Sequence, residues 1–312
     1  MSWLNLFSPR PSSEIVESPR RAVVALGGGG ARGLAHLGAM QAIGESGVQI
    51  ERIVGVSMGS LVGAMCALDP DIQQVQARAL QLLHSPIFQS KQKHLCGVAP
   101  PDDDEHSGST FSWYSRLKKV LDAHRRITKA VRGSSLISDA PLRESIEHLL
   151  PDVDIADVPN PLSIVAVDLL SGGRVVLESG SLRKAVLAST AIPGIFPPVP
   201  WDDMLLCDIG VIESIPTVIA QSYASDLTIA VDVGQDPMRI QRCDTALDVM
   251  MRLDDICERM MRRHVIEVAD IVIRPEVGNI AWFDFSSSET VIELGRSAAK
   301  RTLNDYLYRR VA

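Results

Sequence analysis

The sequence contains few cysteines, and their spacing excludes two common uses of that residue. The five cysteines among its 312 residues include no CxxC pair. An odd number without this spacing argues against a disulfide framework and a zinc ribbon, and favours a reducing compartment. We therefore expect no metal site, and we interpret the cysteines as small, buried apolar residues: Cys66, Cys96, Cys207, Cys243 and Cys257.

A long hydrophobic run is also missing near the start of the sequence. Residues 1–20 contain three prolines but lack a basic lead followed by an apolar stretch, so we expect neither a signal peptide nor a spanning helix there. We predict a flexible tail over residues 1–20 and a cytoplasmic protein. Peripheral contact with the inner face of the membrane stays open, because the tail carries Trp3, Leu4, Leu6 and Phe7.

The chain lacks an excess of positive charge. It has 31 lysines and arginines against 38 aspartates and glutamates, for a net charge of -7, which excludes a general attraction to nucleic acid or to anionic membrane. A local exception is the segment 112–132, where basic residues surround an apolar stripe at helical spacing. Two interpretations stay open: an amphipathic helix that lies on anionic lipid, or a solvated outer helix of the domain.

Strand and helix patterns alternate along the rest of the chain. An apolar run at residues 22–26 leads into a glycine loop and helical spacing over 31–44, and a strand pattern at 52–56 leads into a second helical face. This alternation predicts an α/β fold with a mostly parallel central sheet flanked by helices.

Further strands are expected at 163–169, 174–178, 204–207, 227–233 and 270–273. The first two flank Gly172 and Gly173 and so predict a hairpin. Apolar periodicity fades between about 85 and 135, which we interpret as a variable insertion within one domain over 21–312. A hydrophobic content of 46% is enough to give such a domain a full core.

Ser57 lies in a GxSxG pentapeptide, Gly55-Val56-Ser57-Met58-Gly59. Small residues on both sides of a serine allow a sharp turn that exposes its hydroxyl. A predicted strand precedes this turn and a predicted helix follows it, which is the context that the motif requires. We therefore predict that Ser57 is a nucleophile, and the positive end of the following helix favours negative charge beside it.

Four consecutive glycines follow the first predicted strand. Their backbone N–H groups can converge on one anion without interference from side chains. This suits an oxyanion hole at Gly28, Gly29 and Gly30. However, Gly28, Gly30 and Gly33 also satisfy GxGxxG, a weak indication of a nucleotide, although a dinucleotide site expects an acidic residue where Ser57 stands.

Three ordered motifs resemble those of the patatin-like phospholipase family in its bacterial single-domain form. They are Gly28-Gly29-Gly30-Ala31-Arg32-Gly33 with His36, the GxSxG pentapeptide, and residues 188–198 ahead of Asp208. The resemblance extends over nearly all of 21–312 except the insertion. It implies a three-layer hydrolase domain without metal or cofactor, whose partner is a lipid or acyl-ester substrate and not a nucleic acid.

The resemblance also implies which residues act. Ser57 would be the nucleophile and Asp208 its general base in a dyad that forms an acyl-enzyme. The remaining assignments are an oxyanion hole at Gly28, Gly29 and Gly30, supported by Arg32, Gly33, Gly55, Gly59 and Gly210. A carboxylate becomes an effective base near neutral pH when burial raises its pKa, and Leu205, Leu206 and Ile209 are apolar neighbours of Asp208. Ile192, Ile195, Phe196, Val199 and Trp201 either wall an acyl chain or belong to the core.

Two residues of the first motif, Arg32 and His36, can also be interpreted as structural residues. Arg32 either binds an anionic head group or packs the glycine loop. His36 is expected to be a packed, hydrogen-bonded histidine rather than a base.

The segment after Asp208 departs from the family pattern. Ile209 replaces a glycine, while Glu213 and Ser214 stand where asparagines are usual. Because isoleucine does not easily adopt a positive φ, we expect a loop of different shape. Two alternatives to the hydrolase therefore stay open: a lipid-binding or regulatory module without activity, and a nucleotide-binding protein that uses the segment from Gly28 to Gly33.

His264 follows Ser57 and Asp208 in the chain order of an α/β-hydrolase triad. It shares helical spacing with Met250, Leu253, Cys257, Met260 and Met261, which predicts a packed helix rather than a catalytic loop. Asp208 instead follows the strand at 204–207, whose end is where parallel sheets present catalytic groups. We therefore predict a dyad, and leave the oligomeric state and the lipid class open.

Overall fold

A computed structural model describes residues 20–86, 88–90, 135, 137–236, 240, 243–244, 246–278, 280–281 and 283–311. Nearly all of the expected tail and insertion, together with the basic segment 112–132, lies outside these described residues. The strands are β1 (Arg21–Leu26), β2 (Gln49–Val56), β3 (Leu162–Asp168), β4 (Arg174–Leu177), β5 (Val199–Trp201), β6 (Met204–Cys207), β7 (Leu227–Val231) and β8 (Ile271–Ile273). The helices are α1 (Ala35–Glu45), α2 (Met58–Leu68), α3 (Ile72–Leu83), α7 (Ala140–Leu149), α8 (Leu182–Thr190), α9 (Thr217–Gln221), α10 (Ala246–Ile266) and α11 (Ser288–Val311), with the 3-10 turns η1 (Gly30–Leu34) and η2 (Ile155–Asp157).

The strands form one sheet in the order β5-β6-β3-β2-β1-β7-β8, with β4 paired to β3 beside this path. In this order the neighbouring strands β3, β2, β1, β7 and β8 are parallel to one another. By contrast, β4 and β6 run antiparallel to β3, and β5 runs antiparallel to β6. The predicted mostly parallel sheet and the hairpin around Gly172 are thus confirmed.

The central strands are apolar because helices cover both faces of the sheet. Every residue of β3 and β7 is buried, and so are five of the six residues of β1. Strands buried on both faces read as continuous apolar runs, which is the pattern that the sequence showed at these positions.

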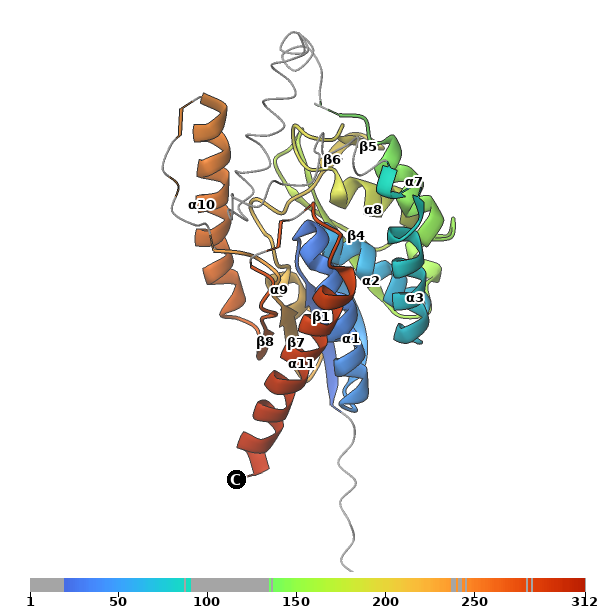
Figure 1. Cartoon of the computed structure of the whole chain (residues 1–312), viewed down its shortest axis with the longest axis vertical. Helices are drawn as coiled ribbons and strands as arrows, with labels where there is room; N and C mark the ends of the chain where they lie inside the picture. Colours follow the sequence, from blue (N-terminus) through green and yellow to red (C-terminus); the bar gives the residue numbers. More distant parts are fainter. Residues whose placement is uncertain are drawn as a thin grey trace, which may run out of the picture.

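The connections place the helices in two layers around the sheet (Figure 1). The right-handed crossovers β1–α1–β2 and β2–α2–β3 move in one direction along the sheet, so they put α1 and α2 on one face. The crossover β7–α10–β8 moves in the other direction and puts α10 on the opposite face, beside α9. In the first layer α11 lies directly on α1, where a Cβ on Gly38 would stand 1.8 Å from the Ile292 carbonyl oxygen.

Two predictions about burial are wrong. The α10 face that carries Met250, Leu253, Met260 and His264 is exposed rather than packed, because only the opposite side of the helix meets the domain. Among the cysteines, Cys66 and Cys207 are buried as expected, but Cys243 and Cys257 are exposed, and Cys96 lies outside the described residues.

Candidate active site

Ser57 occupies a strained turn between β2 and α2. Its backbone has φ 53° and ψ -125°, a region that a residue with a side chain occupies only when its surroundings enforce it. The flanking glycines make the turn possible, since a Cβ on Gly59 would stand 2.2 Å from the Leu26 carbonyl oxygen and one on Gly55 2.5 Å from the Gly59 carbonyl oxygen. This is the geometry that a GxSxG nucleophile requires.

A second serine holds this turn in place. The N–H of Ser57 donates to Ser189 Oγ at 2.9 Å, and the Ser189 hydroxyl in turn donates to the Val165 carbonyl oxygen at 2.7 Å. The elbow is therefore tied to α8 and β3. Ser189 belongs to the third motif, but sequence reasoning missed its role because nothing in that motif indicates which hydroxyl reaches the elbow.

Strand register brings Asp208 beside Ser57. Val56 pairs with Val165 in the parallel β2–β3 ladder, and Cys207 pairs with Val167 in the antiparallel β6–β3 ladder. Both Ser57 and Asp208 therefore come level with Ala166. Asp208 follows β6, the strand that was expected at 204–207. However, β6 runs antiparallel to β3, so it does not belong to the parallel set whose strand ends were expected to present the catalytic groups.

Burial makes Asp208 an unusually weak acid. Its side chain is buried among Leu206, Cys207 and Ile209, and this burial raises the pKa to about 6, while hydrogen bonds from the Ser57 side chain and the Gly210 N–H oppose part of the rise. The Gly210 N–H lies 2.7 Å from Asp208 Oδ1. Among the described residues other than glycine, positive φ occurs only at Ser57 and Asp202, so Ile209 fits the loop without strain.

One of the three glycines expected in the oxyanion hole already uses its N–H. Gly28 donates to the Ser214 carbonyl oxygen at 2.8 Å, so it can serve an oxyanion only by breaking that bond. Gly29 and Gly30 line the same pocket as Ser57. Of the three N–H groups that were expected to form the oxyanion hole, only those of Gly29 and Gly30 are therefore candidates.

Arg32 and His36 each contact a backbone carbonyl oxygen of the glycine loop. Arg32 is buried, and its guanidinium donates to Gln235 Oε1 at 2.7 Å and to the Gly29 carbonyl oxygen at 3.4 Å. Burial lowers the pKa of Arg32 to about 10 and that of His36 to about 4. His36 Nε2 lies 2.7 Å from the Gly27 carbonyl oxygen, so the prediction of a packed, hydrogen-bonded histidine is confirmed.

An ion pair between the buried Glu213 and the partly exposed Arg174 anchors the segment that follows Asp208. Glu213 Oε2 lies 2.6 Å from Arg174 Nε on β4, and the Glu213 side chain is almost fully buried. The main chain turns tightly before it, since the N–H groups of Ile212 and Glu213 both donate to the Ile209 carbonyl oxygen. Ser214 then meets Gly28, so one short loop connects the Asp208 carboxylate to the glycine loop.

We expect Arg174→Gln to destabilise the fold by about 1–3 kcal/mol, because it leaves the Glu213 carboxylate buried without its cation. Burial already raises the pKa of Glu213, and a raised pKa favours the protonated form in the folded state. The loss should therefore be small at pH 5 and grow towards pH 8. Urea unfolding at both pH values measures it, and Arg174→Gln/Glu213→Gln is the control that should recover part of the loss. An equal loss at both pH values would contradict this account.

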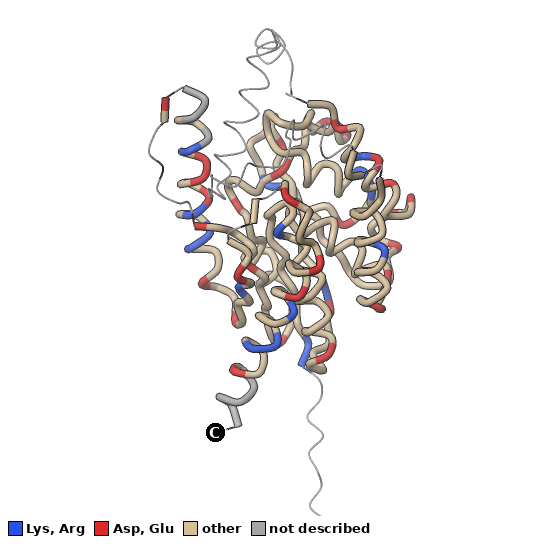
Figure 2. Tube along the Cα trace, in the orientation of Figure 1, with Lys and Arg blue, Asp and Glu red and all other residues tan. Residues whose placement is uncertain are grey.

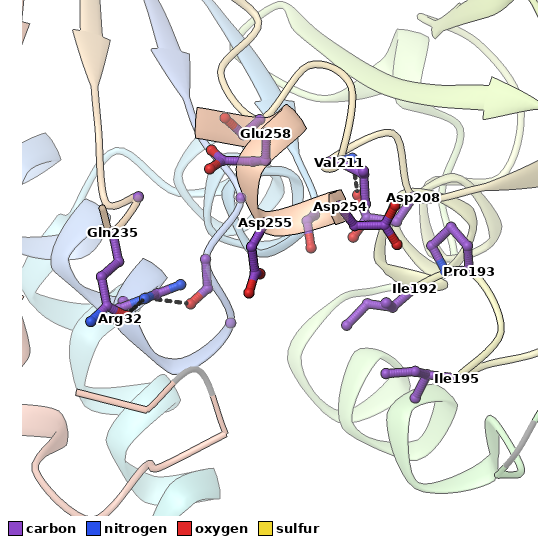
Figure 3. Close-up of a pocket in the computed structure, with 17 residues that line it drawn as sticks. Arg32, Ile192, Pro193, Ile195, Asp208, Val211, Gln235, Asp254, Asp255 and Glu258 are labelled. Carbon is purple, nitrogen blue, oxygen red and sulfur yellow. Dashed lines mark hydrogen bonds between the residues drawn. The ribbon is translucent and has the colours of Figure 1, made fainter. Parts of the chain in front are cut away.

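The pocket beside Ser57 and Asp208 has a volume of about 210 Å³. Ile192, Pro193 and Ile195 form an apolar wall, which is one of the two interpretations left open for the isoleucines, but Phe196, Val199 and Trp201 do not line this pocket. Figure 3 shows Arg32 and Gln235 on one side, the apolar wall on the other, and three carboxylates that come from α10: Asp254, Asp255 and Glu258. Sequence reasoning missed these carboxylates, because only the folded chain brings α10 to the pocket.

The inner side of α10 is fastened by Arg262. Its guanidinium contacts Asp232 at 3.0 Å, Glu258 at 3.0 Å and the Gln235 carbonyl oxygen at 3.0 Å. Since Gln235 accepts from Arg32, α10 is connected to the glycine loop. His264, on the exposed side of α10, does not line the pocket.

In the part of the chain that the structure describes, no three histidine, cysteine, aspartate or glutamate side chains are grouped to hold a metal ion. A search of the same residues for a helix long and apolar enough to cross a membrane finds none.

Comparison with known proteins gives consistent matches. The sequence model of the patatin-like phospholipase family matches residues 24–220. Patatin-like phospholipase domain-containing protein 6 of Mus musculus is 31% identical over 211 residues, which cover 67% of this chain and 13% of that protein. An uncharacterized NTE family protein of Mycobacterium tuberculosis is 30% identical over 217 residues, which cover 70% of this chain and 50% of that protein. The chain thus spans half or less of the length of these relatives.

A solved structure, that of VipD from Legionella pneumophila, aligns with 92% of this chain and 67% of its own. The TM-score is 0.44 and the sequence identity is 16%.

Proposed function

The chain belongs to the patatin-like phospholipase family, and from this premise we propose that it is a serine acyl-hydrolase of lipid-like esters that uses a Ser57–Asp208 dyad. One observation carries the proposal: the strained elbow presents Ser57 beside a buried carboxylate whose pKa is raised to about 6. A carboxylate with its ordinary pKa would be too weak a base for a serine hydroxyl.

In the first half of the reaction, Ser57 Oγ attacks the ester carbonyl carbon while its proton passes to Asp208. The carbonyl oxygen becomes an oxyanion, which the N–H groups of Gly29 and Gly30 stabilise. The tetrahedral intermediate then expels the alcohol, and Asp208 returns the proton to the leaving oxygen. An acyl-enzyme on Ser57 remains.

In the second half, water attacks the acyl carbon and transfers a proton to Asp208. Collapse of the second intermediate releases the acid, and the proton returns to Ser57. The apolar wall of Ile192, Pro193 and Ile195 suits an acyl chain at this position.

The two other hypotheses have weaker support. A nucleotide at the glycine loop would place its phosphates near the carboxylates of Asp254, Asp255 and Glu258, which repel them. A module without activity would not require the base loop to keep its hydrogen bonds and its buried carboxylate, yet both are present in this chain.

Reaction with a fluorophosphonate probe tests the proposal, because only an activated serine reacts quickly. We expect labelling of Ser57, identified by peptide mass spectrometry, and none in Ser57→Ala. The base must be deprotonated, and its pKa is raised to about 6, so labelling should be slow at pH 5 and reach a plateau above pH 7. An unlabelled wild-type protein would refute the hydrolase.

A further inference from the structure

Exposed apolar side chains gather on three segments of the described chain. Seven of them are more than half exposed. Met260 lies apart, in the carboxyl-terminal half of α10, and we name the other six the apolar rim: Leu169, Leu170, Ile212, Val249, Met250 and Leu253. Single exposed leucines are ordinary on a protein surface, but a group of large apolar side chains indicates contact with another apolar phase.

The segments of the apolar rim lie at the carboxyl end of the parallel strands, where the active-site pocket lies. Leu169 and Leu170 follow the carboxyl end of β3, a few residues beyond the level of Ser57. Ile212 belongs to the loop whose neighbours Val211 and Ser214 line the pocket. An ion pair connects the segment of Leu169 and Leu170 to that of Ile212. It joins Arg174, which follows the β3–β4 turn, to Glu213, which is adjacent to Ile212.

The third segment is the amino-terminal half of α10. Val249, Met250 and Leu253 stand within two turns of Asp254 and Asp255, which line the pocket. In Figure 1 the amino-terminal half of α10 extends beyond β7 and β8, towards the level of β5 and β6. Figure 3 shows Val211 of the Asp208 loop next to Asp254 of α10.

The charges at the mouth indicate what kind of surface fits the rim. Three carboxylates from α10 line the pocket, and the whole chain carries a net charge of -7. Basic and acidic residues both occur along α10 (Figure 2), so this helix is not a basic strip. An anionic surface would face these carboxylates, whereas a neutral one would meet only the apolar side chains and incur no repulsion.

We propose that the apolar rim docks the protein on a zwitterionic lipid surface and so places the pocket mouth against its substrate. This rests on the proposed lipid hydrolase function. The rim comes from three separate segments near the pocket, rather than from one continuous groove, which suits a fluid lipid surface that adapts to it. Docking then depends on burial of apolar area and not on charge.

The test is binding of the Ser57→Ala protein, which cannot turn over lipid, to phosphatidylcholine vesicles in a sedimentation assay. Adding Leu170→Gln and Leu253→Gln should weaken binding by roughly tenfold for each leucine, the loss expected when an apolar side chain no longer leaves water. Binding of the parent should change little between low and high salt. The same two changes in the active protein should leave kcat/KM for a water-soluble ester within about twofold, because neither leucine lines the pocket.

Val218→Gln is the matched control, since Val218 is an exposed apolar residue on α9 outside the rim. The proposal is overturned if the double variant binds as tightly as its parent, if Val218→Gln loses as much, or if high salt abolishes binding. It is also overturned if sedimentation shows a dimer that Leu253→Gln dissociates, because the face would then join two copies. If hydrolysis of the soluble ester fails while vesicle binding behaves as expected, the proposed function is wrong and the docking surface stands.

Discussion

Asp208→Asn should lower kcat/KM for a water-soluble ester by about 1,000-fold or more while the protein stays folded. General base catalysis contributes on the order of 100- to 10,000-fold, and an amide cannot accept the proton of Ser57. The isosteric amide keeps an oxygen that can accept from the Gly210 N–H, which now bonds to Asp208 Oδ1. Steady-state kinetics on a short-chain ester measures the loss.

The same variant should be more stable than the wild type at pH 8. The pKa of Asp208 in the folded state is about 6, raised from 3.8, so its ionised form is disfavoured by folding. The stability that the protonated carboxyl contributes is fully present below pH 4 and is lost as the pH rises through 6. Removing the charge should therefore raise the free energy of unfolding at pH 8, by up to about 3 kcal/mol, and change little at pH 4.

His264→Gln is the control for the assignment of the base. His264 is exposed and does not line the pocket, so this variant should retain most of the activity. If His264→Gln proves as inactive as Ser57→Ala, with both proteins folded, the assignment of Asp208 as the base is wrong.

Gly29→Ala should lower turnover by about 100-fold, the cost of one oxyanion donor in well-studied hydrolases. A Cβ on Gly29 would stand 2.7 Å from Val233 Cγ2, so the glycine loop must shift and its N–H groups move with it. Because the clash involves a side chain rather than backbone, the fold should survive. The rate of acyl-enzyme formation, followed by probe labelling, is the direct readout.

Two further variants separate the oxyanion hole from a general effect of alanine. Gly29→Ala/Val233→Ala removes the clashing methyl group and should recover part of the lost rate. Gly44→Ala, on α1, adds a Cβ with no atom within 4 Å and should leave the rate unchanged. A Gly29→Ala protein that hydrolyses at the wild-type rate would show that the loop has another role.

The sequence predicted the strands and helices around Ser57 better than it predicted the surface of the molecule. Local patterns located β1, β2 and the helix after Ser57, because the required conformation is enforced by adjacent residues, as Gly55 and Gly59 show at the elbow. The position of α10 could not be predicted in the same way. The helical spacing of its apolar residues is the same whether those residues face the core or the solvent, and in the structure they are exposed.

The sequence by itself determined three local features: the sharp turn at Ser57, the glycine loop after β1, and the strand that precedes Asp208. Only the tertiary structure decided how they combine. The antiparallel entry of β6 sets Asp208 level with Ser57, and the bond between Gly28 and Ser214 withdraws one donor from the expected oxyanion hole. It also brings the carboxylates of α10 to the pocket. These contacts join residues that are far apart in the chain. The burial of the Asp208 side chain, which raises its pKa to about 6, likewise exists only once the surrounding helices and strands have packed.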